Sequence, residues 1–146
     1  MSQEFSHLSG KLRHQILPLL PIPTAPDAPL RRRVALPQGE LAQLLNGPEP
    51  IRYLATLELL AGTVRGNHYH LAKRETVYVL SGALRLTALD LDTGERVVLD
   101  LAAGHAVFIA PRIAHALRVT APGWGIEFAP DPLDPADTLR HALDPT

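Results

Sequence analysis

The stretch GTVRGNHYHLAKRETVYVLSG, residues 62–82, places two histidines two positions apart and a glutamate at the start of an apolar run. Side chains alternate between the faces of a β-strand, so His68 and His70 project from the same face if residues 66–70 are extended. Glu75 begins the run ETVYVL beyond a short turn, and a hairpin there would bring its carboxylate beside both imidazoles. Imidazole suits Zn, Ni, Fe or Cu, and a carboxylate adds hard character that suits Fe or Mn. The stretch indicates either a metal site or a polar loop.

The chain around this stretch has the pattern of an all-β fold. Short runs rich in Val, Leu, Ile, Thr and Tyr alternate with turn residues, and the turn DTGE contains Gly94, which can adopt positive φ. About seven short strands with tight turns predict a sandwich or a small barrel. The expected strands are residues 51–59, 75–80, 83–91, 96–101, 105–110, 115–120 and 124–129.

Proline is concentrated at the two ends of the chain, which has 14 prolines in 146 residues. Residues 18–37 cannot form a long helix or a central strand, so they are expected to be an extended arm. One or two helical turns are expected at 39–46 and a short helix at 136–143. The predicted organisation is an N-terminal arm with a short helix at 1–48, in the same domain as a barrel at 49–130, and a C-terminal tail at 131–146.

Length and composition exclude several classes of protein. A chain of 146 residues predicts one domain, and the lack of cysteine excludes disulfide scaffolds and thiolate metal sites. The net charge of −1 gives no reason to expect nucleic acid or a membrane surface as partner. The N-terminal sequence has no signal-peptide pattern and no run long enough to span a membrane, so a cytoplasmic location is expected.

A second block, GHAVFIAPRIAHAL at 104–117, adds His115 after a glycine turn and a strand. Together the two blocks resemble the cupin family over about residues 50–129. Gly62, His68, His70, Glu75 and Gly82 meet every spacing of its first motif, and Gly104 and His115 fit the second. The second motif departs from the family at three turn positions, Ala110, Arg112 and Val119.

This resemblance implies a single cupin barrel, that is, a jelly-roll or double-stranded β-helix. It also implies that one divalent metal ion, whether Zn, Fe, Mn or Ni, is held inside the barrel by His68, His70, Glu75 and His115. Four protein ligands leave one or two positions open on a five- or six-coordinate metal, which suits Lewis-acid chemistry or substrate binding.

A narrower resemblance concerns GTVRGNHYH. It looks like a segment of the deoxythymidine-diphosphate-sugar 3,5-epimerases, which usually lack the metal set and use the histidine as a base. It looks closer to the cupins of polysaccharide biosynthesis that retain the metal ligands, which share the sequence Arg-Gly-Asn-His-Tyr-His. This resemblance implies an enzyme that isomerises or epimerises a small carbonyl compound such as a sugar or sugar nucleotide. An iron-dependent dioxygenase and a non-catalytic small-ligand-binding module remain open, because they share the fold and the metal set.

Two residues are candidates for a catalytic role. Arg65 could hold a phosphate or carboxylate at the barrel mouth, or it could be a solvated turn residue. Glu127 is out of phase with its apolar neighbours, so it faces either the cavity or the solvent.

The expected partners are a small-molecule ligand or substrate and a second copy of the chain. A small barrel exposes strand edges and outer apolar residues such as Tyr78, which is expected to face away from the metal. Cupins are also commonly dimeric. The remaining histidines are not expected to bind metal: His105 is expected at the surface, and His14 has no partner at ligand spacing.

Overall fold

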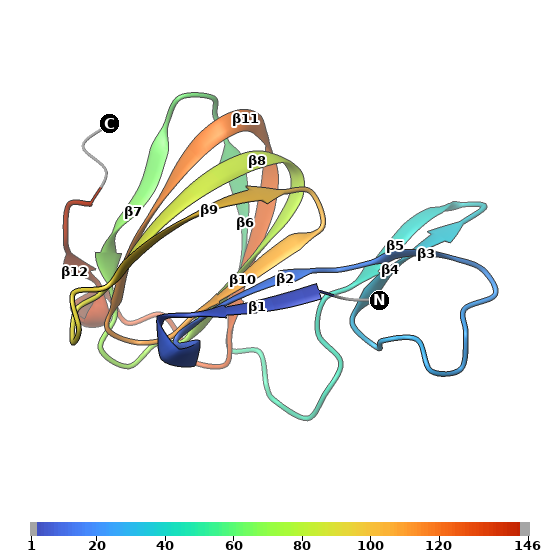
Figure 1. The fold of residues 1–146 in the computed structure, drawn as a ribbon, viewed down its shortest axis with the longest axis horizontal. Coiled ribbons are helices and arrows are strands. Elements are labelled where there is room, and N and C mark those ends of the chain that lie inside the picture. The colour runs from blue at the N-terminus through green and yellow to red at the C-terminus, as the bar shows by residue number, and fades with distance from the viewer. Residues whose placement is uncertain (1–2, 144–146) are drawn as a thin grey trace.

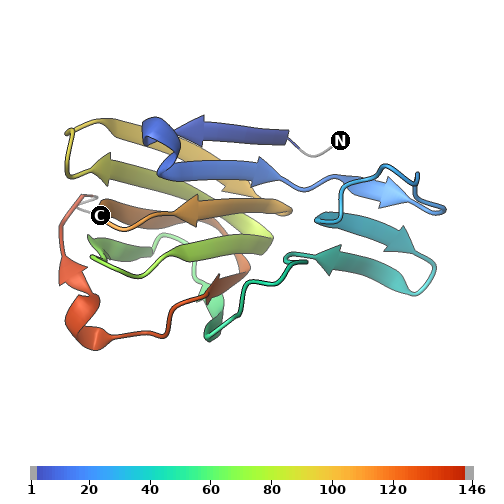
Figure 2. The same cartoon turned by 90° about the horizontal axis from the view of Figure 1, so that it is seen from below.

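The computed structural model describes residues 3–143, and strands make up almost all of its regular structure (Figures 1 and 2). The elements are β1 Gln3–His7, the 3-10 turn η1 Leu8–Gly10, β2 Leu12–Ile16, β3 Leu19–Pro21, β4 Arg32–Leu36, β5 Gly39–Gln43, β6 Tyr53–Leu59, β7 Val64–Tyr69, β8 Glu75–Asp90, β9 Arg96–Ala102, β10 His105–Ile109, β11 Ile113–Ala129, the 3-10 turn η2 Pro135–Asp137 and β12 Leu139–Arg140. Among the described residues, nine strands form one sheet in the order β1-β2-β10-β8-β11-β7-β12, with β6 on β11 and β9 on β8. Strands β3–β5 form a separate small sheet.

The barrel depends on two long strands that bend through both of its halves. β8 and β11 pair along most of their length, and the ladder shifts register three times between Val119 and Gly125. Before this bend β11 also pairs with β7, and after it with β6. Gly82 lies at the bend with φ +82°, where an added Cβ would come 2.6 Å from the Ala121 carbonyl oxygen. The Ala-Pro-Gly break after residue 120 is therefore a bend within one strand rather than a loop between two.

Apolar side chains on the inner faces of these strands fill the barrel. The alternation of buried positions along β8, such as Val77 with Val79 and Leu84 with Leu86, is the two-residue period expected of a strand with one core face. Burying a Leu or Val side chain contributes roughly 1.5–3 kcal/mol, so this cluster is the main source of stability. The prediction of an all-β jelly-roll barrel is confirmed.

The N-terminal region contains more sheet than the sequence indicated. β1 and β2 form a hairpin, and β2 pairs with β10, so the barrel sheet is not confined to residues 49–130. The helix expected at 39–46 was wrong, because residues 39–43 form β5 and pair with β4 from Arg32–Gln43 to Leu36–Gly39. The apolar spacing of this segment fits a helix or a strand, and pairing with β4 decides between them.

The arm that contains the sheet β3–β5 projects from one end of the barrel (Figure 2). Its base covers part of the outer barrel surface: Tyr78 is only 2% exposed and lies in a small cluster with Leu17 and Ala106, against which Ala42 and Leu44 pack. Tyr78 therefore faces away from the barrel core, as predicted, but it is not an exposed outer residue. The chain's own arm covers it.

The C-terminal tail returns to the barrel beside β7. The helix expected at 136–143 was wrong: the segment forms the short turn η2, which Asp134 caps by accepting a hydrogen bond from the Ala136 N–H, and then β12. β12 pairs with β7 through Leu139–Tyr69 and Arg140–His68. No helix within residues 3–143 is long and apolar enough to cross a membrane.

Candidate metal centre

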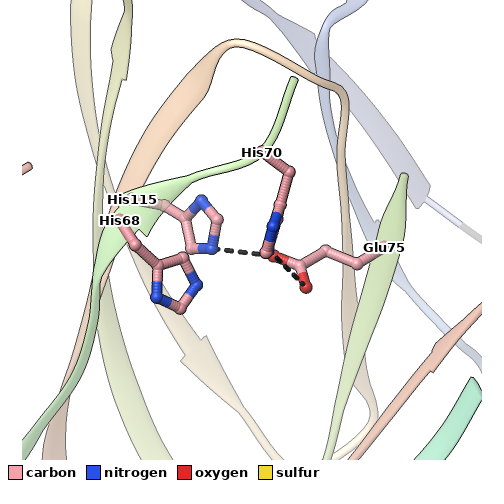
Figure 3. Close-up of side chains that lie close together, drawn as sticks. All are labelled: His68, His70, Glu75 and His115. Carbon is pink, nitrogen blue, oxygen red and sulfur yellow. Dashed lines mark ion pairs between the residues drawn. The ribbon is translucent and has the colours of Figure 1, made fainter. Parts of the chain in front are cut away.

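Four side chains from different elements converge inside the barrel (Figure 3). His68 comes from β7, His70 from the turn that follows it, Glu75 from the start of β8, and His115 from β11. One nitrogen or oxygen of each lies within 4.8 Å of the others. His70, Glu75 and His115 are buried, and His68 is partly buried. The structure thus brings together all four residues that the cupin resemblance implied as metal ligands.

An irregularity in β7 positions His68 in this cluster. His68 pairs with His115, but Gly66 pairs with the next residue, Ala116, so Asn67 is an extra residue in β7 and has φ +56°. Gly66 itself has φ +86°, and an added Cβ there would lie 2.7 Å from the His115 carbonyl oxygen. Only glycine allows the two strands to approach this closely beside the ligands.

Arg65 precedes this bulge in β7. Arg65 pairs with Leu117, a core residue, so the two lie on the same face of the sheet. Its side chain is nevertheless exposed, and its Nη2 donates a hydrogen bond to the Glu58 carbonyl oxygen at 2.7 Å. Arg65 is therefore a surface residue tied to β6 by this contact.

Two of the histidines are oriented by backbone carbonyl groups. Nδ1 of His70 is 2.8 Å from the Asp137 carbonyl oxygen, and Nδ1 of His115 is 2.9 Å from that of Ile113. A carbonyl can only accept, so each Nδ1 carries a proton and each Nε2 offers its lone pair in the neutral ring. The buried Nε2 of His70 has no hydrogen-bond partner among the described residues. Rings held at one nitrogen with the other directed into a cluster are typical of metal-ligating histidines.

Glu75 lies between the other ligands. Its Oε1 is 2.7 Å from Nε2 of His115, and its Oε2 is 3.7 Å from Nε2 of His70. Burial by itself would raise the pKa of Glu75, but the neighbouring His115 and Lys73 outweigh it and hold that pKa below its usual range. Burial likewise opposes the charged form of His115, but the Glu75 carboxylate raises its pKa. Burial lowers the pKa of His68 to about 4, so this ring is neutral at pH 7.

Glu127 faces the interior, and a lysine connects it to the cluster. Lys73 is 4% exposed, and its Nζ lies 3.1 Å from Glu127 Oε2, 3.3 Å from Glu75 Oε2 and 4.3 Å from the centre of the Tyr53 ring. Burial opposes the charge of Lys73, but the carboxylates of Glu75 and Glu127 raise its pKa. Burial and the charge of Glu75 raise the pKa of Glu127.

Sequence reasoning missed Lys73. The only signal available was its position two residues before Glu75, which places both on one face of an extended chain. A recess of about 420 Å³ adjoins this lysine, between the turn after β7 and the tail, and is lined by Ala72, Lys73, Asp131, Pro132, Asp134, Ala136 and Asp137.

His14 and His105 form a second histidine contact, outside this cluster. The sequence predicted His105 at the surface and His14 without a partner, and both predictions were wrong. His14 is 8% exposed, and its Nε2 lies 2.9 Å from Nδ1 of the half-buried His105. Burial and then the mutual charge repulsion lower the pKa of His14, and burial also lowers that of His105. Pairing of β2 with β10, which the sequence did not predict, brings these two rings together.

Comparison with known proteins supports the barrel assignment. Residues 55–123 match the family model described as "Cupin domain". No curated protein sequence matches the chain.

Solved structures with the same fold include several sugar-nucleotide enzymes. The chain superposes on a dTDP-6-deoxy-D-glucose-3,5-epimerase from Legionella pneumophila, in complex with dTDP-4-keto-L-rhamnose, with a TM-score of 0.74, 16% identity and coverage of 99% of this chain and 80% of that one. A dTDP-4-dehydrorhamnose 3,5-epimerase from Bacillus anthracis, with TDP and PPi bound, gives a TM-score of 0.71 at 13% identity over 94% and 82% of the two chains. A TDP-quinovose 3,4-ketoisomerase from Campylobacter jejuni gives 0.67 at 18% identity over 77% and 89%. At these identities the similarity shows a shared fold.

Proposed function

We propose that this chain, whose residues 55–123 match the cupin family model, is an enzyme that isomerises or epimerises a small carbonyl compound, such as a sugar or sugar nucleotide. We propose further that His68, His70, Glu75 and His115 hold one divalent metal ion, Zn, Fe, Mn or Ni. The observation that carries this proposal is the orientation of the histidines. His70 and His115 are each held at Nδ1 by a carbonyl, and the buried Nε2 of His70 has no partner among the described residues.

A metal ion in this set would supply Lewis acidity toward a carbonyl oxygen, which makes the neighbouring C–H more acidic. The chain's own residues would then handle the proton. Glu127 faces the interior and has a raised pKa, which suits a general acid or base at neutral pH. Lys73 holds its carboxylate in place at 3.1 Å. Arg65, at the surface, is the candidate for binding an anionic part of the substrate, because the residue is exposed.

The proposed substrate class rests on two similarities. The stretch Arg65–His70 resembles the corresponding sequence of cupins of polysaccharide biosynthesis. The structural neighbours named above are enzymes of dTDP- or TDP-sugars. A keto-sugar nucleotide has both a carbonyl group and an anionic diphosphate, so it fits a site that combines a metal with an arginine at the surface.

A metal-independent reaction in the same site is a second candidate. His115 and Glu75 are 2.7 Å apart, and each favours the charged form of the other. Such a pair can stabilise a developing charge without a metal, and the neutral His68 beside it can accept a proton.

Elemental analysis tests the metal set directly. The wild-type protein is expected to contain about one metal ion per chain, and His70→Ala and His115→Ala are expected to lose it. Equal metal content in all three proteins would refute the assignment and favour the metal-independent reaction.

Substrate and reaction class are tested on protein loaded separately with zinc and with ferrous iron. Sugar nucleotides should raise the melting temperature of both forms, since a ligand that binds only the folded state stabilises it. Arg65→Ala should lose most of that shift and keep its metal. Oxygen uptake by the iron-loaded form and not by the zinc-loaded form, with no thermal shift from any sugar nucleotide, would support the dioxygenase instead. A thermal shift from an unrelated small molecule, with no turnover, would support a binding module.

We also propose that the protein forms a homodimer. Tyr78 does not support this, because the arm covers it, but other apolar side chains on β6, β8 and β11 are exposed, with Leu54 at 67%, Trp124 at 47% and Leu80 at 46%. Light scattering that gives the mass of a monomer at micromolar concentration would refute this proposal.

A further inference from the structure

We propose that Asp137, in the C-terminal tail, is a positioning residue that holds the loop carrying His70 in the geometry that binds metal. The inference rests on the metal site proposed above. It assigns a role to a segment that lies outside the residues matched by the family model, 55–123.

One residue of the tail makes four contacts with the ligand loop. The Asp137 carboxylate accepts hydrogen bonds from the backbone N–H groups of Leu71, Ala72 and Lys73, at 2.6, 3.1 and 3.1 Å. Its carbonyl oxygen accepts the Nδ1–H of His70 at 2.8 Å. Asp137 therefore holds both the imidazole of His70 and the three residues that follow it in the chain.

These contacts act on the part of the site that is least constrained by regular structure. His68 lies in β7, while Glu75 and His115 lie in long paired strands, but His70 follows the end of β7 and precedes β8. Three successive N–H groups that point toward one carboxylate form a strong anion-binding arrangement, because hydrogen bonds to a charged acceptor are stronger than neutral ones. Without that carboxylate three successive N–H groups of the loop between His70 and Glu75 would lose their acceptor, and the Arg74 N–H would keep its own acceptor, Asp131.

The tail is itself attached on both sides of Asp137. Before it, Asp134 caps η2 and accepts from the Asp137 N–H through its carbonyl oxygen at 2.9 Å. After it, the His141 N–H donates to the Asn67 carbonyl oxygen at 2.8 Å, and the Leu143 N–H donates to Asn67 Oδ1 at 2.9 Å. Asn67 is the bulge residue next to His68, so the tail contacts the chain beside two of the four ligands.

The proposal predicts an effect on metal affinity beyond any effect on folding. Asp137→Ala removes both side-chain acceptors and keeps the backbone carbonyl that binds His70. Asp137→Asn keeps one side-chain oxygen as an acceptor and should retain part of the metal affinity. Asp134→Ala is the matched control, because it removes the cap in the same tail without changing a contact to the ligand loop.

Titration of the metal-free proteins with Co²⁺ measures both affinity and coordination geometry, since the visible absorption of Co²⁺ reports its ligands. Removal of a residue that orients a metal ligand typically weakens binding about 10–100-fold. We expect a loss in that range with an altered spectrum for Asp137→Ala, a smaller loss for Asp137→Asn, and less than about 3-fold for Asp134→Ala. Urea unfolding of each metal-free variant gives its stability for comparison.

Two outcomes overturn the inference, and they differ from each other. The first outcome applies where the wild type binds Co²⁺. Asp137 has no positioning role if Asp137→Ala binds Co²⁺ with the same affinity and spectrum as the wild type. The same conclusion follows if its affinity falls only as much as that of an equally destabilised Asp134→Ala. If the wild type itself binds no Co²⁺, the metal site fails and the inference fails with it. Should Asp137→Ala not fold, the Asp137→Asn variant decides, because wild-type affinity and spectrum in that variant would contradict the proposed graded loss.

Discussion

Replacement of Lys73 by methionine should strongly destabilise the metal-free protein. Lys73 is 4% exposed and Glu75 is 3% exposed, so their contact is a buried ion pair rather than a surface one. The ammonium also pairs with Glu127, whose side chain is 19% exposed. Methionine keeps an unbranched side chain of similar length and removes only the charge and the donors. It therefore leaves two nearby carboxylates without the cation between them.

The size of the effect follows from this burial. Loss of one partner from a buried pair costs about 3–5 kcal/mol, whereas a surface pair contributes about 0–1 kcal/mol. For a protein of about this length, 1 kcal/mol corresponds to roughly 2–4 °C in melting temperature, so a fall of about 6–20 °C is expected. The lost contact between Lys73 and the Tyr53 ring adds about 0.5–2 kcal/mol at most.

Urea unfolding in the presence of a chelator measures this effect, and a double-mutant cycle identifies its cause. Glu127→Gln alone should cost little, because Lys73 keeps Glu75 as its partner and can still donate to the amide oxygen. In the Lys73→Met background the same change should recover stability, because it removes the Glu127 charge that Lys73 no longer balances, whereas Glu75 keeps its contact with His115. A coupling of about 1–3 kcal/mol is expected. A loss below about 1 kcal/mol for Lys73→Met, with an unchanged dependence on urea, would show that Lys73 is not part of a buried charge network.

Two other predictions concern the backbone and pH. Gly66→Ala should lower the free energy of unfolding more than Gly94→Ala does. Both residues have positive φ, which strains an alanine by about 1–2 kcal/mol. Of the two, only Gly66 would bring the new Cβ against a backbone atom, the His115 carbonyl oxygen at 2.7 Å. Equal urea midpoints for the two variants would contradict this. The pKa values of His14 and His105 are lowered in the folded state, so the unfolded chain binds more protons than the folded one. The free energy of unfolding should therefore fall as pH drops below about 6.5, by up to about 1.4 kcal/mol per pH unit for each histidine. His14→Gln should make urea unfolding less sensitive to pH between 7 and 5, and an unchanged slope would refute the assignment.

The sequence by itself determined the features that depend on local spacing. The alternation of apolar residues predicts most of the barrel strands, because a strand with one buried face has a period of two. The positive φ of Gly94 follows from the turn between two such runs, and the structure has φ +79° there. The spacing of His68, His70, Glu75 and His115, with the resemblance that it carries, selects the four side chains that the structure brings within 4.8 Å.

Only the tertiary structure decided what lies around those four side chains. The two helices predicted near the ends of the chain, at 39–46 and 136–143, were wrong because these weak patterns suit a helix or a strand. Pairing with other segments decides the outcome: residues 39–43 pair with β4, and 139–140 with β7. The contacts of Lys73 with Glu127, of His70 with Asp137 and of His14 with His105 join residues 54, 67 and 91 positions apart. No local period reports such contacts, because each depends on where the barrel brings remote strands together, and that is set by burial of the whole core.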